Sequence, residues 1–428
     1  MEADTLPKKP SSLANALQFL KATSRYILFD YENIKINFSN DNQFSSSGIF
    51  GAGTGLANFW GYRFSSDNGP SRAFMLGLSN DVGKRAANGN LTDNFSQKNS
   101  IDLSTSRPLW EGAKIDLTWK VGWSMNKSTS LQSDADGNTI ITNINSTGTL
   151  DRTFLTLPPT MIFSVFKSGI KTVHELYNPN SPNPSQNLSE AFIKGFETLP
   201  LGSKIGFLND LAKYIPRPNW RITWDGLEKL SFFAKYTKRV SLEHAYQSSY
   251  NEGWKINPDG SQGVQTQKIN YGFAPLLGLN TTFNELWSGN LSGSVKYSTR
   301  SNFDLGITTK NITETFSRDI GITLNYSKSG FEIPLFGVSL KNDIEFSFSY
   351  TNTKNSTVVF KMDDFTEEGT PQDGTTRTML EPRIKYVISS RVTLTVFYKR
   401  SSVEPEGAAR IPPSTINEAG LDIRIKIQ

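Results

Sequence analysis

The chain of 428 residues contains no cysteine, which excludes disulfides, thiolate metal sites and a cysteine nucleophile. It has only two histidines, His174 and His244, and no His-x-x-x-His spacing of the kind that binds zinc. On a strand, His244 would share its face with Leu242 and Tyr246, so we interpret it as a packed or interfacial side chain. The sequence therefore predicts no metal site and no cofactor.

Long apolar runs are absent as well. Only 36% of the residues are hydrophobic, and no run approaches the roughly 20 residues of a transmembrane helix. This excludes a helical membrane protein but leaves open a membrane β-barrel, whose lumen-facing positions are polar. The 45 basic and 40 acidic residues are scattered along the chain. Because nucleic-acid-binding proteins cluster their basic residues, no nucleic acid is expected as a partner.

What the chain has in abundance is alternation between apolar and polar residues, most clearly in 113–125 and 338–351. Side chains of a strand point alternately to opposite faces, so these segments separate an oily medium from a wet one. They are longer than the usual strand of about 5–6 residues and long enough for the roughly 9–11 residues of a membrane-spanning strand. The polar positions that we predict to face a lumen are Lys114, Asp116, Lys120, Lys341, Asp343 and Glu345.

The alternation divides the chain into three parts. Residues 1–157 are predicted to hold strands, long loops and a short helix at 11–29, and residues 216–428 to hold strands almost without interruption. Residues 158–215 break the rhythm, with helical patterns at 161–177 and 188–198 around a proline-rich stretch. We interpret this part as an insertion that caps or lines the pore. The whole chain is expected to contain roughly 14–16 strands, with boundaries uncertain by about 2–4 residues.

Two environments fit the apolar faces: the core of a soluble or secreted β-sandwich, and lipid. Strand length and charged residues in mid-strand favour lipid around a water-filled lumen. Aromatic residues at the ends of the predicted strands favour it too, as in the interfacial girdles of membrane barrels. These aromatic residues are Trp123, Tyr297, Tyr326, Tyr350 and Tyr398. The sequence thus predicts an all-β protein with an antiparallel transmembrane barrel, and a sandwich with charged outer faces stays open.

Three short motifs resemble chemical sites. The segment from Asp134 to Asn138 begins like a calcium loop but has Asn145 where the loop needs glutamate, so we interpret it as a hairpin turn. The glycine run at 51–55 lacks the lysine of a phosphate-binding loop and is interpreted as a loop. The acidic segment 363–368 is expected to be solvated. With no nucleophile elbow either, no catalytic residue is predicted, and the protein is not expected to be an enzyme.

Two stretches, 218–227 and 241–251, resemble the C-terminal region of the SprA/Sov family. Further stretches that look similar follow in the same order at 273–279, 333–343, 386–398 and 417–428. The chain departs from the family at Trp224, where the family tends to have tyrosine, and at Glu243 and Ala245. The residues that carry the resemblance are Pro218, Asn219, Trp220, Arg221, Asp225, Gly226, His244, Tyr246 and Tyr250.

SprA/Sov proteins form the outer-membrane translocon of the type IX secretion system in Bacteroidota, which gliding species also need for motility. The resemblance implies the C-terminal portion of a very large barrel that passes secreted and cell-surface proteins, including gliding adhesins. Its implied partners are outer-membrane lipid, cargo proteins, and plug or accessory subunits. The first ten residues lack a secretory signal, so we expect a fragment. A smaller self-contained outer-membrane channel and a secreted β-rich adhesin remain the alternatives.

Overall fold

The structure is a computed structural model that places most of the chain. It describes residues 33–49, 72–79, 82, 85–87, 89–135, 138–154, 156, 169–197, 217–335, 338–389, 391–407, 409 and 411–426. The helix predicted at 11–29 and the glycine run at 51–55 lie outside the described residues.

The described residues form a single antiparallel sheet of 13 strands with a few short helices. The strands are β1 (Lys35–Ser46), β2 (Asn90–Trp110), β3 (Ala113–Ser133), β4 (Thr139–Thr153), β5 (Asn219–Asp225), β6 (Thr237–Ile256), β7 (Gln262–Phe283), β8 (Asn290–Gly306), β9 (Asn311–Leu335), β10 (Val338–Lys361), β11 (Thr370–Val387), β12 (Val392–Pro405) and β13 (Ser414–Ile425). The helices are α3 (Arg72–Met75), α4 (Gly169–Leu176), α5 (Pro184–Phe196), the 3-10 turn η3 (Leu227–Lys229) and α7 (Ser231–Ala234). An all-β, antiparallel fold with a small helical insertion is therefore confirmed.

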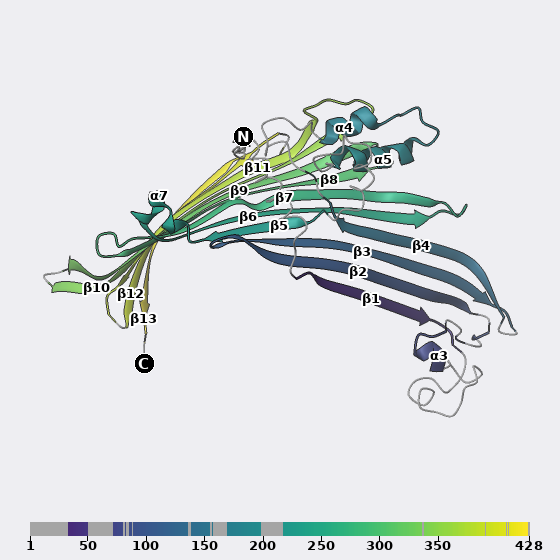
Figure 1. Ribbon diagram of the computed structural model, residues 1–428, viewed down its shortest axis with the longest axis horizontal. Coiled ribbons are helices and arrows are strands. Elements are labelled where there is room, and N and C mark those ends of the chain that lie inside the picture. The colour runs from purple at the N-terminus through teal and green to yellow at the C-terminus, as the bar shows by residue number, and fades with distance from the viewer. Residues whose placement is uncertain are drawn as a thin grey trace, which may run out of the picture.

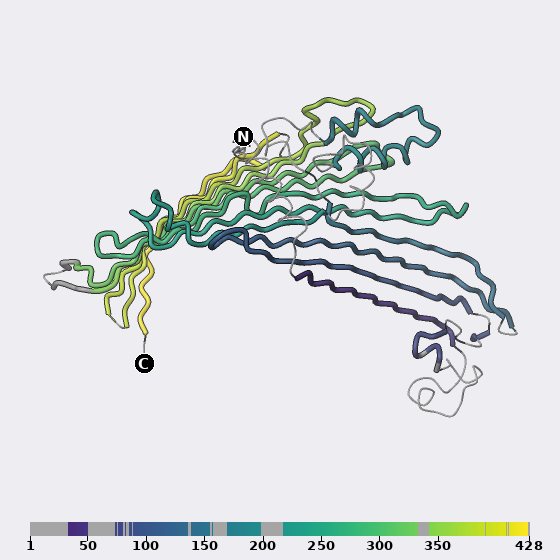
Figure 2. Tube along the Cα trace, viewed as in Figure 1, coloured from purple at the N-terminus to yellow at the C-terminus, as the bar shows by residue number. Residues whose placement is uncertain are grey.

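The sheet is a meander in which strands that follow one another in the chain lie side by side. It is curved and twisted, with the early and late strands at opposite ends of the arch (Figures 1 and 2). Among the described residues, β1 pairs only with β2 and β13 pairs only with β12. The sheet therefore ends in two edges whose backbone groups have no neighbouring strand within the described chain.

The strands are far longer than a bilayer requires. β9 has 25 residues and β10 has 24, about twice the roughly 9–11 of a membrane-spanning strand. Tyr350 and Tyr398, which we expected at strand ends, lie inside β10 and β12. In β10 and β12 the apolar segment is the part of the strand that begins at the short turn to the preceding strand. The rest of each strand, farther from that turn, is more polar.

One position in the sheet is shared by two strands. β5 pairs with the first part of β3 and with β6, whereas β4 pairs with the rest of β3 and with β6. β4 and β5 therefore act as a single strand that is interrupted between Thr153 and Asn219. The helical insertion leaves and rejoins the sheet at this strand break.

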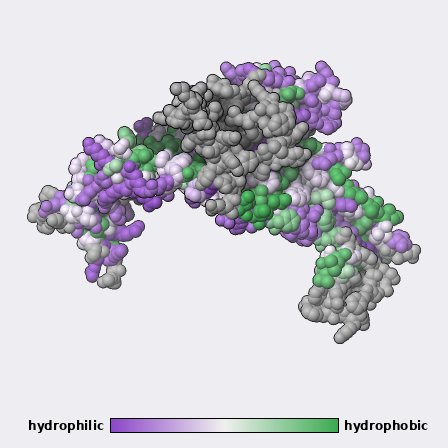
Figure 3. Space-filling model, in the orientation of Figure 1, coloured by the Kyte–Doolittle hydropathy of each residue, from purple (hydrophilic) through white to green (hydrophobic). Residues whose placement is uncertain are grey.

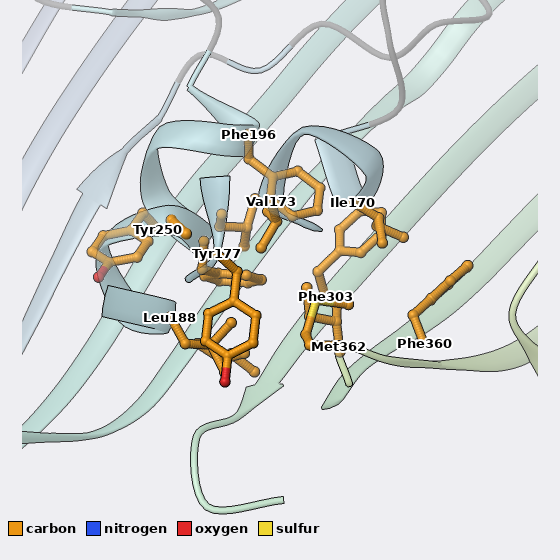
Figure 4. Close-up of a cluster of buried hydrophobic side chains, with 14 of the residues drawn as sticks. Ile170, Val173, Tyr177, Leu188, Phe196, Tyr250, Phe303, Phe360 and Met362 are labelled. Atoms are coloured by element: carbon orange, nitrogen blue, oxygen red, sulfur yellow. The ribbon is translucent and has the colours of Figure 1, made fainter. Parts of the chain in front are cut away.

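The helices α4 and α5 pack against the far parts of β6 to β10 and form the main hydrophobic core (Figure 4). Val173, Leu188 and Phe192 are fully buried there against Tyr250 and Phe303. Burying one such phenylalanine or leucine stabilises the docked insertion by roughly 1.5–3 kcal/mol. These two helices confirm part of the predicted pattern at 161–177 and 188–198.

The insertion lies on the apolar side of the sheet. In β8, Phe303 alternates in step with Val295 and Tyr297, so all three point to the same face. The predicted lumen-facing Lys114 and Asp116 belong to the opposite face, because pairing places Ile115 with the apolar residues. The helices of the insertion therefore pack on the side of the sheet where apolar residues cluster. That the insertion caps or lines a pore stays a prediction.

Candidate functional site

The candidate site is the sheet itself, because its two faces differ in polarity. Directly opposed residues of antiparallel strands share a face, so the strand pairing assigns every described strand residue to one side. One side exposes a band of large apolar residues that crosses almost the whole sheet, which we call the apolar belt. Figure 3 shows apolar side chains gathered over β1 to β3 in one view. Exposed members are Ile36, Phe38, Trp123, Leu277, Val295, Leu324, Ile384, Val396, Leu421 and Ile423.

The apolar belt crosses the strands obliquely. Pairing connects Leu117 in the belt on β3, in six steps from strand to strand, to Lys354 on β10. Lys354 lies six residues beyond Phe348, a belt residue of the same strand. One residue per strand is about 3.3 Å along the strand for each 4.8 Å across the sheet, a tilt of roughly 35°. Strands of membrane barrels tilt by about 35–45°.

The opposite side, which we call the polar face, carries charges in compensated pairs. Lys114 and Asp116 form an ion pair of 3.4 Å, and Glu345 pairs with Lys385 across two strands at 3.0 Å. Lys120 belongs to the same face, opposite Asp102. Asp343 is exposed, and Lys341 lies in β10 with its side chain outside the described ones.

Further ion pairs cross from strand to strand on the polar face. They are Arg221–Glu243 at 2.5 Å, Lys268–Asp304 at 2.8 Å and Lys399–Glu418 at 3.8 Å. All of these side chains keep substantial exposure, so each pair stabilises the sheet by only about 0–1 kcal/mol. Their consequence is electrostatic: neighbouring charges of opposite sign leave little net field on the polar face.

Several residues of the family motif lie at the strand break. Where β4 ends and β5 begins, backbone groups of the flanking strands lose their partners, and side chains replace them. Asn219 Oδ1 accepts a hydrogen bond of 2.8 Å from the backbone N–H of Ser248. On the other flank, Thr153 Oγ1 lies 3.5 Å from the backbone nitrogen of Lys120. Side-chain oxygens therefore face backbone N–H groups on both flanks of the break, in place of the missing strand partners.

Aromatic rings fasten the start of the insertion at the break. The Trp220 ring stacks on Tyr246 with centroids 4.3 Å apart. The Tyr246 hydroxyl donates to the carbonyl of Thr156, whose N–H donates back to it at 3.0 Å. At the other end of the insertion, Arg217 forms an ion pair with Glu197. Both ends of the insertion are thus tied to one place, beside Pro218.

The remaining motif residues are structural as well. His244 Nδ1 lies 2.7 Å from the carbonyl oxygen of Leu276, which confirms the interpretation as a packed side chain. Tyr250 is buried beneath the insertion and donates to Glu252. Asp225 pairs with Arg239 at 3.6 Å, and Gly226 adopts a φ of 92° to start η3, which favours glycine.

The acidic segment between β10 and β11 is more than a solvated loop. Asp363 pairs with Lys310 at 3.0 Å, and Glu367 pairs with Lys171 of α4. The Phe365 ring stacks on His174 of α4 with centroids 4.3 Å apart. The hydrogen bond from Lys171 lowers the pKa of Glu367 below its usual range. This loop therefore contacts α4 and adds an ion pair and a ring contact to the docking of the insertion.

The turn at Asp134, which begins like a calcium loop, is a hairpin turn in the structure. The segment at Asp134 is the hairpin turn between β3 and β4, where Asp134 Oδ1 accepts from the Asn138 N–H at 2.8 Å. Among the described residues, no three acidic or histidine side chains come together as metal ligands. No helix in the described part is long and apolar enough to span a membrane.

The sequence did not predict the strand break, nor which charged residues form ion pairs with each other on the polar face. Nothing in residues 139–153 or 219–225 marks them as two parts of one strand, since that relation exists only in the register with β3 and β6. Alternation does place Lys399 on a polar face, but it cannot show which acidic residue lies opposite.

Comparisons with known proteins add little to this geometry. No family model and no curated protein matches the chain. One solved structure, titled OmpT (in-vitro folded), an outer membrane protein of Vibrio cholerae in its trimer form, aligns with 92% of this chain and 99% of its own, at 9% identity and a TM-score of 0.19. At that TM-score we draw no conclusion from the likeness. The chain is an all-β protein with one long-stranded, two-faced antiparallel sheet.

Proposed function

We propose that this sheet is part of the wall of a protein-conducting channel in an outer membrane. The apolar belt would face lipid, and the polar face would line a water-filled lumen. The observation that carries the proposal is the belt: exposed apolar residues follow one another across the sheet at an angle of roughly 35° to the strands. Soluble monomers rarely expose contiguous apolar patches of more than a few hundred Å².

The polar face fits passage of large hydrophilic cargo. Small hydroxyl and amide side chains alternate with the compensated ion pairs, as in the run Thr313, Thr315 and Ser317 on β9. Such a surface offers hydrogen bonds that water replaces easily. The function is therefore conduction without chemistry on the cargo.

The more specific proposal is the translocon of the type IX secretion system, in a Bacteroidota-type outer membrane. The SprA/Sov resemblance supports it, and four of its motif residues, Pro218, Asn219, Trp220 and Tyr246, lie at the strand break beside the insertion. The free edges of β1 and β13 also support a larger wall, because unpaired backbone groups are not tolerated in lipid. The proposed partners are outer-membrane lipid, secreted proteins including gliding adhesins, and plug or accessory subunits.

Cell fractionation joined to a secretion assay tests this proposal. The native protein should sediment with the outer membrane, and cells that lack it should retain type IX cargo in the periplasm. Residence in the outer membrane with normal secretion of that cargo would leave only the smaller, self-contained channel. Recovery in the soluble or culture fraction would favour the secreted adhesin.

A further inference from the structure

An aromatic patch lies at the short-turn end of the sheet, outside the apolar belt and the strand break. Two of its members are the most exposed of the large aromatic residues described: Phe232 on α7, at 76%, and Trp287 in the turn between β7 and β8, at 79%. Leu230 and Tyr236 beside them are also exposed. We call these four residues the turn patch.

The backbone at Trp287 is unfavourable for its side chain. Trp287 has a φ of 49° and Ser288 a φ of 58°, in a tight turn closed by the Leu286–Gly289 bridge. Turns of this geometry favour asparagine and glycine, and a bulky residue at positive φ is an outlier. A tryptophan that is both strained and 79% exposed leaves most of its ring available for contact outside the described chain.

Several hydrogen bonds and an ion pair fix the backbone under the turn patch, while its side chains stay exposed. Phe232 contacts Phe233 edge-on, and the Lys235 ammonium lies over the Tyr236 ring. Glu228 Oε2 accepts from the backbone N–H of Val240 at 2.9 Å, and Lys229 pairs with Glu111 of the neighbouring turn. Asn284, at the start of the turn that contains Trp287, donates its backbone N–H to the carbonyl of Tyr236 at 2.9 Å. These bonds join η3, α7 and two turns into one platform.

The platform lies on the apolar side of the sheet. η3 packs on β6 where Val240 is fully buried, and Val240 alternates in step with Leu242 of the apolar side. α7 stands off the sheet at the end opposite α4 and α5 (Figure 1). On β6, ten residues separate Val240 from Tyr250, which the insertion covers. At a tilt of roughly 35° this is a height of about 27 Å, close to the apolar band of about 25 Å in membrane barrels.

We propose that the turn patch is an interfacial anchor that inserts into the phospholipid headgroup layer on the short-turn side of the membrane. Tryptophan, tyrosine and phenylalanine are the side chains that favour this layer. Lys235 and Lys238 are exposed next to the patch and supply positive charge for lipid phosphates. The inference rests on the proposed membrane function and adds to it the location of one bilayer boundary, at α7. The ends of the strands farthest from α7 then protrude beyond the opposite side of the bilayer.

Nitroxide labels on single cysteines test this anchor, and the 428 residues contribute no cysteine of their own to the background. The whole native protein would carry Phe232→Cys, Val295→Cys in the belt, or Asp259→Cys in the exposed turn between β6 and β7. After reconstitution in vesicles of phosphatidylethanolamine and phosphatidylglycerol, the accessibility of each label to oxygen and to a nickel chelate would be measured by power saturation.

The anchor predicts that the oxygen-to-nickel accessibility ratio at Phe232→Cys lies between the high ratio at Val295→Cys and the low ratio at Asp259→Cys. A ratio equal to that at Asp259→Cys would overturn the anchor while leaving the belt in lipid. Shielding of Phe232→Cys from both reagents would also overturn it, because a protein partner would then cover the patch. A water-like ratio at Val295→Cys would instead contradict the proposed membrane function itself.

Discussion

At the scale of the residue, neighbouring side chains on one strand are expected to have opposite tolerances. Phe346 belongs to the apolar belt, and Ser347 points to the polar face. An arginine in contact with lipid at the bilayer midplane costs about 2–4 kcal/mol, whereas one in a water-filled lumen costs little.

Phe346→Arg should therefore lower the folding stability in lipid by roughly 2–4 kcal/mol, with Ser347→Arg as the matched control. Urea titration of the protein in bilayers, followed by its intrinsic fluorescence, measures both. Equal losses at the two positions would contradict the assignment of the faces.

A second residue-scale prediction concerns the strand break. Asn219→Ala removes the acceptor of the Ser248 N–H and leaves that group of a buried residue unsatisfied. The expected destabilisation is about 1–3 kcal/mol, with faster hydrogen exchange at the Ser248 amide. Asn219→Asp keeps an acceptor oxygen and should restore slow exchange. If the alanine variant exchanges as slowly as the native protein, the break is closed in another way.

At the scale of the element, sequence patterns predicted the strand segments in the apolar belt but not the parts of the same strands that extend beyond it. Leu291 to Tyr297 and Ile320 to Tyr326 are strands as predicted, because alternation is strong where one face meets an apolar medium. Between Tyr297 and Phe303 both faces of β8 are polar, so period-two alternation fades there although pairing continues. The same effect hid β7, whose first half, from Gln262 onward, reads as a polar loop. The helices were visible as patterns, but which side they cover depends on pairing.

The docked insertion is expected to respond to pH through its edge contact. Lys171 lowers the pKa of Glu367. A lowered pKa means that the contact contributes stability above the ordinary glutamate pKa of about 4.3 and loses it as pH falls through the lower folded value. Hydrogen exchange in α4 should therefore speed up, relative to α5, as the pH falls below about 4.

Glu367→Gln serves as the control for this prediction. It should show the faster exchange in α4 at neutral pH and no further acid-dependent step there. An acid-dependent step of native size in this variant would assign the effect to another group.

At the scale of the whole molecule, the main question is what pairs with the two edge strands of the described sheet, β1 and β13. β1 and β13 end the described sheet on opposite sides of the arch (Figure 1). A self-contained barrel would have to pair them with each other, whereas a larger wall needs further strands between them. Cysteine pairs placed on the two edges, such as Ile36→Cys with Ile423→Cys, distinguish these cases.

In the native protein, oxidation should not join these two cysteines, because further strands would separate the edges. A pair across β12 and β13, Leu394→Cys with Ile423→Cys, is the positive control, since these residues lie opposite each other. Efficient cross-linking of β1 to β13 would support the smaller channel and contradict membership in a larger wall.

The central claim, that one face of this sheet meets lipid and the other meets water, is tested most directly by a label scan along β10. Single cysteines at each position from 344 to 351 would carry nitroxides in the protein reconstituted in vesicles. The proposal predicts an oxygen-to-nickel accessibility ratio that alternates with a period of two, high at Ile344, Phe346, Phe348 and Tyr350 and low between them. A uniformly low ratio, or shielding of the apolar positions from both reagents, would contradict it.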